Sequence, residues 1–171
     1  MNRLPRVIVI MGVSGCGKSL IGSMLARELD AVFEDADEFH SDANKAKMSD
    51  GIPLTDEDRW PWYRILRERI VAHRASGRDY VLACSALKQS YRQWLCDNDE
   101  NSHAIFVYLK GSRELISARI SARQGHFMPP KLMDSQFAVL EEPQGALKMD
   151  ASLAPDEIVR RIFDHLFGTA K

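Results

Sequence analysis

The sequence of 171 residues has few cysteines, no long apolar run and almost no net charge. Its three cysteines, at positions 16, 84 and 96, form no C-x-x-C pair, which argues against a disulfide framework or a zinc site. Free thiols indicate a reducing, cytosolic setting. No apolar run approaches the ~20 residues that a membrane-spanning helix needs, and the N-terminus lacks the pattern of a signal peptide. With a formal net charge of −1, we expect a cytoplasmic protein with neither nucleic-acid nor membrane partners.

What the sequence does contain is a glycine-rich loop of the form G-x-x-x-x-G-K-S at residues 12–19. An apolar run precedes it, and a helical apolar pattern follows it, which is the context that a phosphate-binding loop requires. The glycines allow a tight turn whose N–H groups point at phosphate oxygens, and the next helix adds a partial positive charge. Lys18 should reach the β- and γ-phosphates, and the Ser19 hydroxyl should ligate Mg²⁺. The residues expected to hold the nucleotide are Gly12, Val13, Ser14, Gly15, Cys16, Gly17, Lys18 and Ser19.

Strands and helices alternate along the chain. Apolar runs predict strands at residues 6–11, 31–34, 80–84, 104–109 and 146–150, and helical patterns fall at 18–28, 56–76, 85–95, 112–123, 131–140 and 155–167. Proline is tolerated only in the first turn of a helix, and Pro61 lies within the helix predicted at 56–76. The regular part of that helix should therefore begin near Arg59 or Trp60. We expect short helical pieces and loop at 38–54, and a polar turn at 97–102. This order predicts an α/β three-layer P-loop fold, like that of nucleoside monophosphate kinases, with a five-stranded parallel sheet and a helical lid at about 123–143 in a single domain.

Two aspartates follow the second predicted strand, at positions 35 and 37. Ligands of parallel sheets collect at the carboxyl ends of the strands, so this pair should face the phosphate loop. Alternate residues of an extended chain point to opposite sides, and the two carboxylates need not share one task. We expect Asp35 to join the Mg²⁺ shell through water, and Asp37 to act on the acceptor hydroxyl as a general base. The alternative is a pair of solvated loop carboxylates.

Two arginines point to a lid over the phosphates. Arg119 and Arg123 lie four residues apart and share one helix face. Gly125 and Pro129 would supply a hinge just beyond them. A lid arginine can neutralise charge on the transferring phosphoryl group while closure excludes water. The alternative is a pair of solvated surface arginines.

With these residues in place, the sequence resembles the gluconate kinases (gluconokinases), small P-loop kinases related in fold to shikimate and adenylate kinases. The resemblance covers nearly the whole chain and weakens after about Gln144. Two departures stand out, because the family usually has glycine at the place of Ala36 and proline at the place of Ser41. Neither departure removes a charged group. The matching motifs include Asp35-Ala36-Asp37-Glu38-Phe39-His40, Asp58-Arg59, Pro61-Trp62, Cys84-Ser85-Ala86-Leu87-Lys88, Tyr91-Arg92, Gly125-His126-Phe127-Met128-Pro129 and Ser135-Gln136-Phe137.

The resemblance implies that ATP, with Mg²⁺, phosphorylates the 6-hydroxyl of D-gluconate to give 6-phospho-D-gluconate and ADP, and that the protein is a homodimer. Gluconate carries a carboxylate and several hydroxyls, so its pocket needs cations and hydrogen-bonding groups. Arg59 is the best candidate for the carboxylate, because a guanidinium can bind it in a bidentate manner. By the same resemblance, Arg119 stacks on adenine and Arg123 contacts phosphates, with the exchange of these two roles as the alternative. The candidate acceptor-site residues are Asp37, His40, Arg59, Lys88, Arg92 and His126.

Other interpretations remain open at this point. Arg92 could instead pair with a helix carboxylate, and His40 could cap the next helix. The acceptor could be another small polyol acid such as shikimate, although the motifs between residues 35 and 62 argue against it. A third possibility, a non-catalytic nucleotide-binding switch, is disfavoured because the acidic pair, the lid and the basic acceptor residues are all present.

Overall fold

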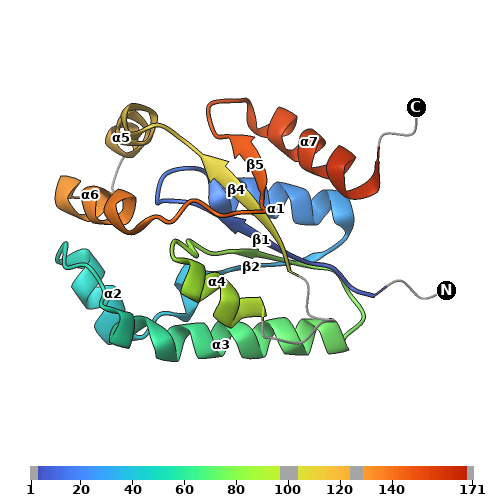
Figure 1. The fold of residues 1–171 in the computed structure, drawn as a ribbon, viewed down its shortest axis with the longest axis horizontal. Helices are drawn as coiled ribbons and strands as arrows, with labels where there is room; N and C mark the ends of the chain where they lie inside the picture. Colours follow the sequence, from blue (N-terminus) through green and yellow to red (C-terminus); the bar gives the residue numbers. More distant parts are fainter. Residues whose placement is uncertain (1–3, 97–103, 124–128, 169–171) are drawn as a thin grey trace.

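The computed structural model describes residues 4–96, 104–123 and 129–168. Its centre is a five-stranded, fully parallel sheet in the order β2-β3-β1-β4-β5 (Figure 1). The strands are β1 (Val7–Met11), β2 (Val32–Asp35), β3 (Tyr80–Ala83), β4 (Ala104–Lys110) and β5 (Leu147–Asp150). The helices are α1 (Lys18–Leu29), the short 3-10 helix η1 (Ala36–Phe39), α2 (Asp42–Ser49), α3 (Asp56–Ala75), α4 (Gln89–Cys96), α5 (Arg113–Ala122), α6 (Pro130–Val139) and α7 (Pro155–Phe167). The predicted α/β fold with five parallel strands is confirmed.

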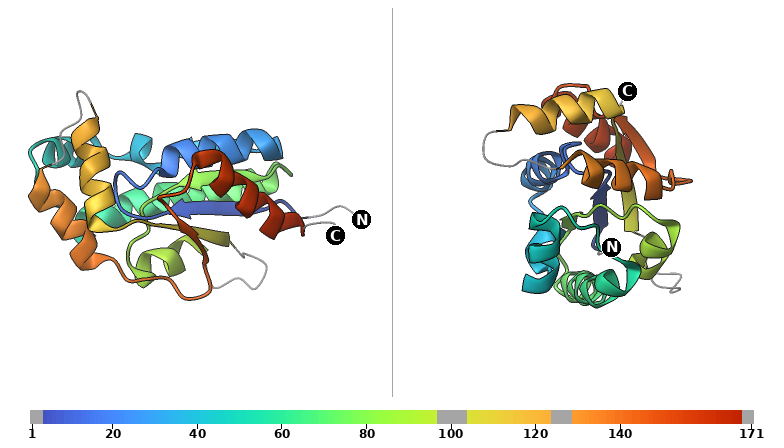
Figure 2. Two further views of the ribbon diagram at one scale, coloured as in Figure 1. Left: turned by 90° about the horizontal axis from the view of Figure 1, so that it is seen from above. Right: turned by 90° about the vertical axis from the view of Figure 1, so that its left-hand side faces the viewer.

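Helices cover both faces of the sheet, and the side chains of β1 show why. All five residues of β1 are at most 1% exposed. Ile8 and Ile10 pack on one face with α1 and α7, whereas Val7 and Val9 pack on the other face with α3 and α4. The views in Figure 2 show these two helical layers on opposite sides of the strands. A strand buried on both faces reads as a continuous apolar run, which is how the sequence revealed it.

The helix predicted at 56–76 is confirmed as α3, which begins at Asp56. The expectation that its regular part begins only near Arg59 or Trp60 is wrong, because Pro61 lies inside the helix. Thr55 explains the earlier start, because its hydroxyl accepts from the Asp58 N–H while the Asp58 carboxylate accepts from the Thr55 N–H. This capping box satisfies two donors at the helix N-terminus. Its stabilisation, together with the packing of α3 on the sheet, outweighs the hydrogen bond that Pro61 cannot make.

The helix that follows β3 was predicted to begin too early. The helix predicted at 85–95 begins only at Gln89, so residues 84–88 form a loop at the end of β3. Ala86 in this loop has a φ of 45°, in the left-handed region that a helix cannot contain. The Gly12 N–H donates to the Ser85 carbonyl over 3.3 Å, which attaches this loop to the glycine-rich loop.

The remaining boundaries agree with the prediction to within two residues, and η1 and α2 are the short helical pieces expected at 38–54. The polar turn predicted at 97–102 and the middle of the predicted lid, residues 124–128, lie outside the described residues. No helix in the described ranges is long and apolar enough to cross a membrane.

Candidate active site

The glycine-rich loop joins β1 to α1 at the carboxyl end of the sheet. Gly12, Gly15 and Gly17 all have positive φ, at 144°, 85° and 106°. At Gly12 a Cβ atom would also lie 2.9 Å from the Leu109 carbonyl oxygen, so the loop needs glycine there on two counts. No side chain caps α1, which leaves its N-terminal N–H groups free to bind an anion.

Lys18 and Ser19 lie where the motif predicts. The Lys18 ammonium donates to the Val13 carbonyl over 3.1 Å and so lies across its own loop. Ser19 donates its hydroxyl to the Asp35 carboxylate, which brings the two predicted Mg²⁺ ligands into direct contact. The other oxygen of Asp35 accepts from the Asp37 N–H at 3.0 Å. This donor set, a hydroxyl and a carboxylate, suits a hard cation that takes its other ligands from water and phosphate.

No group of three or more His, Cys, Asp or Glu side chains within the described residues could hold a metal ion. Mg²⁺ is commonly bound by one or two protein oxygens plus substrate phosphates, not by an all-protein cage. The Ser19–Asp35 pair therefore fits a metal that arrives with its nucleotide.

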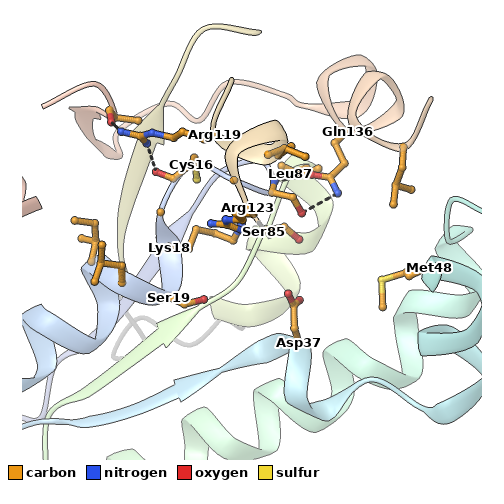
Figure 3. Close-up of a pocket in the computed structure, with 18 of the residues that line it drawn as sticks. Cys16, Lys18, Ser19, Asp37, Met48, Ser85, Leu87, Arg119, Arg123 and Gln136 are labelled. Atoms are coloured by element: carbon orange, nitrogen blue, oxygen red, sulfur yellow. Dashed lines mark hydrogen bonds between the residues drawn. The ribbon is translucent and has the colours of Figure 1, made fainter. Parts of the chain in front are cut away.

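Asp37 lies opposite the phosphate loop, at the second position of η1. Figure 3 shows its carboxylate directed into the same space as Lys18 and Arg123. The side chain is 73% exposed, because it faces an open cavity. Desolvation by the cavity walls nevertheless raises its pKa above the usual value, the positive charge of Lys18 lowers it, and the negative charge of Asp35 raises it. These influences suit a carboxylate that must bind a proton during a reaction.

His40 lies next to Asp37 and is held as a neutral ring. It stacks on Trp62 with ring centroids 4.0 Å apart, and its side chain is only 4% exposed. Burial, with the positive charges of Arg59 and Lys45, lowers the pKa of His40 to about 4. Its Nε2 atom lies 4.0 Å from an Asp37 carboxylate oxygen, and its buried Nδ1 has no hydrogen-bond partner among the described residues. His40 lines the cavity, as predicted, and does not cap the next helix, where Ser41 has that role.

Arg59 also lines the cavity. Its guanidinium donates to the Leu54 carbonyl over 2.7 Å and to the Tyr91 hydroxyl over 3.3 Å. The Asp56 carboxylate lies 4.0 Å away. These contacts fix one side of the guanidinium, so Arg59 is a positioned cation at the end of the cavity where Asp37 and His40 lie.

Lys88 has a carboxylate partner that the sequence did not reveal. Its ammonium donates to both oxygens of Asp56, over 2.8 and 2.9 Å, and the Tyr91 hydroxyl donates to the same carboxylate. The pairing with Asp56 raises the pKa of Lys88. Lys88 is not among the residues that line the cavity. The structure thus gives Lys88 the task of holding Asp56 and Tyr91 beside Arg59.

The prediction that Arg92 contacts the acceptor is wrong. Arg92 is buried, and it donates to the carbonyl oxygens of Ala86, Leu87 and Glu141 over 2.8 to 3.0 Å. It lines a second, smaller hollow instead of the cavity. The alternative of a helix carboxylate is wrong too, since its partners are backbone carbonyls. Arg92 holds the 84–88 loop to the segment that follows α6.

The two lid arginines reach the cavity from α5. Arg119 donates to the Cys16 carbonyl over 3.3 Å and to the Ala151 carbonyl over 2.6 Å, which joins α5 to the phosphate loop and to the end of β5. Arg123 lies beside Lys18 in Figure 3 and lines the cavity. Its backbone N–H donates to the Ile120 carbonyl over 3.2 Å, whereas its guanidinium makes no hydrogen bond or ion pair to another described residue. It is therefore a free cation for phosphate. His126, the last predicted site residue, falls outside the described residues.

A cavity of about 1060 Å³ is lined by the phosphate loop together with Asp37, His40, Arg59, Arg119 and Arg123. One end is formed by Arg119, Ala151 and Leu153, the middle by the phosphate loop, and the other end by Asp37, His40 and Arg59. The volume exceeds the range of about 300–1,000 Å³ that is usual for one small ligand. The cavity can therefore hold a nucleotide and a small acceptor together, with the phosphate loop between the base and the acceptor.

Sequence reasoning missed two site residues. Asp56, which orders Lys88, Tyr91 and Arg59, looked like one of several acids at the start of a helix. Gln136 of α6 bonds to Ser14 of the phosphate loop, and 122 positions separate the two in the chain. The motif Ser135-Gln136-Phe137 was the only signal, and a motif match does not say what a side chain contacts.

Comparisons with known proteins show which family the chain resembles along most of its length. The family model for shikimate kinase matches residues 14–165. A probable gluconokinase of Dictyostelium discoideum is 44% identical, with 94% of this chain and 86% of the relative aligned. A gluconokinase of Arabidopsis thaliana is 42% identical, over 93% of this chain and 91% of the relative. The crystal structure of a gluconokinase from Sinorhizobium meliloti 1021 superposes with a TM-score of 0.83 at 40% identity, over 99% of both chains.

Proposed function

The chain belongs to the gluconokinase family of P-loop kinases, and on this premise we propose that it transfers the γ-phosphoryl group of ATP to the 6-hydroxyl of D-gluconate. The products are 6-phospho-D-gluconate and ADP. The observation that carries the proposal is the cavity itself, in which the phosphate loop and the Asp37–Arg59 end face one another. Gluconokinase relatives at 42 to 44% identity over most of the chain support the choice of acceptor.

On the donor side, the phosphate loop binds the phosphates through its N–H groups and the N-terminus of α1. Lys18 leaves the Val13 carbonyl and bonds to phosphate oxygens. Ser19 and Asp35 would hold Mg²⁺, which when bound neutralises charge on the phosphates. Arg123, which directly follows α5, contacts the transferring group, and Arg119 lies toward the adenine.

On the acceptor side, Arg59 binds the gluconate carboxylate, because its guanidinium is positioned by Leu54 and Tyr91 and still faces the cavity. Neutral His40 lines this end of the cavity, where its Nε2, on the side of Asp37, contacts a substrate hydroxyl. This binding places the far end of the substrate, with its 6-hydroxyl, toward Asp37. His126 remains a predicted acceptor contact.

The transfer step needs one proton acceptor. The 6-hydroxyl oxygen of gluconate forms the new bond to the γ-phosphorus while the bond from that phosphorus to the β–γ bridging oxygen breaks. Asp37 accepts the hydroxyl proton, and ADP takes the electron pair of the broken bond. Lys18 and Arg123 stabilise the charge that develops on the phosphoryl oxygens.

Shikimate is the second candidate acceptor, because the family model that matches residues 14–165 is that of shikimate kinase. Shikimate is also a small hydroxylated carboxylic acid, and Arg59 would suit its carboxylate equally well. The carboxylate therefore does not distinguish the two acceptors. They are distinguished by their shapes and by the positions of their hydroxyl groups, which the cavity has to fit.

We also propose the metal, the cellular location, the domain organisation and the oligomeric state. Mg²⁺ as the metal is supported by the Ser19–Asp35 pair, and a cytoplasmic location is supported by the three free cysteines. The single-domain organisation with a lid at about 123–143 is supported by the unbroken sheet, and the homodimer is supported by the family resemblance alone.

Purified protein with Mg·ATP and a panel of acceptors tests the function. The panel contains D-gluconate, other sugar acids, shikimate and nucleoside monophosphates. We expect ADP release that depends on D-gluconate, with 6-phospho-D-gluconate identified as the product by NMR. Absence of gluconate-dependent turnover at millimolar substrate would refute the proposal.

A further inference from the structure

Gln136 connects the lid helix α6 to the phosphate loop through two hydrogen bonds. Its carbonyl oxygen Oε1 accepts from the backbone N–H of Ser14 over 2.7 Å. Its Nε2 donates to the Ser14 hydroxyl over 3.2 Å (Figure 3). Both residues are half-buried and line the cavity. Gln136 thus bonds to both the backbone and the side chain of Ser14.

The Ser14 N–H belongs to the set of loop donors that bind phosphate oxygens in a P-loop. In this structure its acceptor is a carbonyl oxygen, which offers the same kind of lone pair as a phosphate oxygen but no charge. One N–H cannot make two full-strength hydrogen bonds at once. A phosphate oxygen that binds Ser14 N–H must therefore replace the Gln136 carbonyl.

The position of Gln136 indicates which phosphate does so. In Figure 3, Arg119 and Cys16 lie on one side of Lys18, and Gln136, Leu87 and Met48 lie on the other. Arg119 marks the end of the cavity near Ala151, whereas Met48 belongs to α2 at the acceptor end. The start of α6 is also on the acceptor side, because a Cβ on Gly51 would lie 2.9 Å from Pro129. Gln136 thus meets the loop from the side where the terminal phosphoryl group faces its acceptor.

We propose that Gln136 is a positioning residue that exchanges with the γ-phosphoryl group at Ser14 N–H, so that α6 responds to ATP and not to ADP. In the nucleotide-free protein, Gln136 occupies the donor and holds α6 against the loop. When the γ-phosphoryl oxygen takes the donor, the carboxamide is released from it and α6 is free to adopt its closed position over the acceptor. This inference deepens the proposed kinase function and rests on it.

The substitution Gln136→Glu tests the exchange. A carboxylate has the same shape, accepts the Ser14 N–H more strongly, and repels a γ-phosphate at that place. We expect the Kd of a non-hydrolysable ATP analogue to rise at least about tenfold more than the Kd of ADP, by titration calorimetry. Gln93→Glu, at an exposed position of α4, is the matched control, since it makes the same charge change away from the cavity and should leave the ratio of the two Kd values unchanged.

Gln136→Met gives a second readout, because methionine has a similar length and makes neither bond to Ser14. Hydrogen exchange at the Ser14 amide of the nucleotide-free protein should be faster in this variant than in wild type, and the ATP analogue should restore protection in both. Equal weakening of the ATP analogue and ADP by Gln136→Glu, or unchanged exchange in Gln136→Met, would overturn the inference. These measurements need no acceptor, so a wild-type protein that phosphorylates gluconate while showing either result would refute the exchange and leave the proposed function intact.

Discussion

Asp37 is the single residue on which the proposed chemistry depends most. Asp37→Asn keeps the size and the hydrogen-bonding oxygen but cannot accept the hydroxyl proton. We expect kcat to fall by about 10²–10⁴, the usual contribution of a general base. The Kd for ATP should stay close to the wild-type value, because Lys18 and the loop N–H groups bind the nucleotide. Steady-state kinetics with gluconate and calorimetry with ATP measure the two quantities, and a wild-type kcat in the variant would show that Asp37 is not the base.

His40 makes stability depend on pH in a defined window. Its pKa is about 4 in the folded protein and about 6.5 in the unfolded chain. Between these values the unfolded chain binds a proton that the folded protein does not, so the free energy of unfolding falls as the pH drops from about 6.5 to about 4. At pH 7 and above, the contribution is fully present and amounts to about 3 kcal/mol.

His40→Phe isolates this contribution, because phenylalanine can still stack on Trp62 and does not titrate. Urea denaturation at pH 7.5 and pH 4.5 should show a smaller loss of stability on acidification in the variant than in the wild type. Equal losses in the two proteins would mean that His40 is not held neutral.

At the scale of single residues, the sequence predicted where the site residues lie better than it predicted which groups they contact. Lys18, Ser19, Asp35 and Asp37 lie where the motif and the strand ends predicted, because local chain geometry fixes them. The roles of the basic residues were harder. Arg59 faces the cavity, whereas Arg92 binds backbone carbonyls, and both are simply arginines on helices in the sequence. The difference is set by tertiary contacts that have no local signal.

Among the elements, α3 carries Asp56 and Arg59 in its first turn, so the N-terminal cap of α3 supports the acceptor end. Thr55→Ala removes one half of the capping box with Asp58 and should lower the free energy of unfolding by about 1 kcal/mol. Thr55→Ser is the matched control, because serine retains the hydroxyl and should stay close to wild type. Chemical denaturation of the three proteins measures this. Equal stability of Thr55→Ala and wild type would show that the capping box contributes nothing.

The elements that the sequence predicted well are those with strong local patterns. The buried strands were found because their residues form continuous apolar runs, and α7 was found because its apolar residues recur at helical spacing. The regular part of α3 was predicted to begin too late, because capping and packing tolerate Pro61 inside the helix. The start of α4 was predicted too early, because buried Ala86, in the loop before α4, takes a left-handed conformation that its residue type does not indicate.

For the whole molecule, the topology of the sheet was predictable from the sequence, whereas the side-chain contacts between distant segments were not. The rule that parallel strands present their carboxyl ends at one edge correctly brought the phosphate loop and the Asp35–Asp37 segment together. The long-range contacts that complete the site, from Gln136 to Ser14 and from Lys88 to Asp56, join segments that are distant in the chain. Such pairs cannot be identified from a single sequence, because no local pattern marks two residues that are distant in the chain as partners.

The central claim is that this cavity selects gluconate as the acceptor. The most direct measurement compares kcat/KM for D-gluconate and for shikimate with the same enzyme and saturating Mg·ATP. Because a site built to bond particular hydroxyls rejects an acceptor that leaves those bonds unmade, we predict a ratio of at least about a hundred in favour of gluconate. A ratio of one or less, with shikimate phosphorylated as well as gluconate or better, would contradict the account.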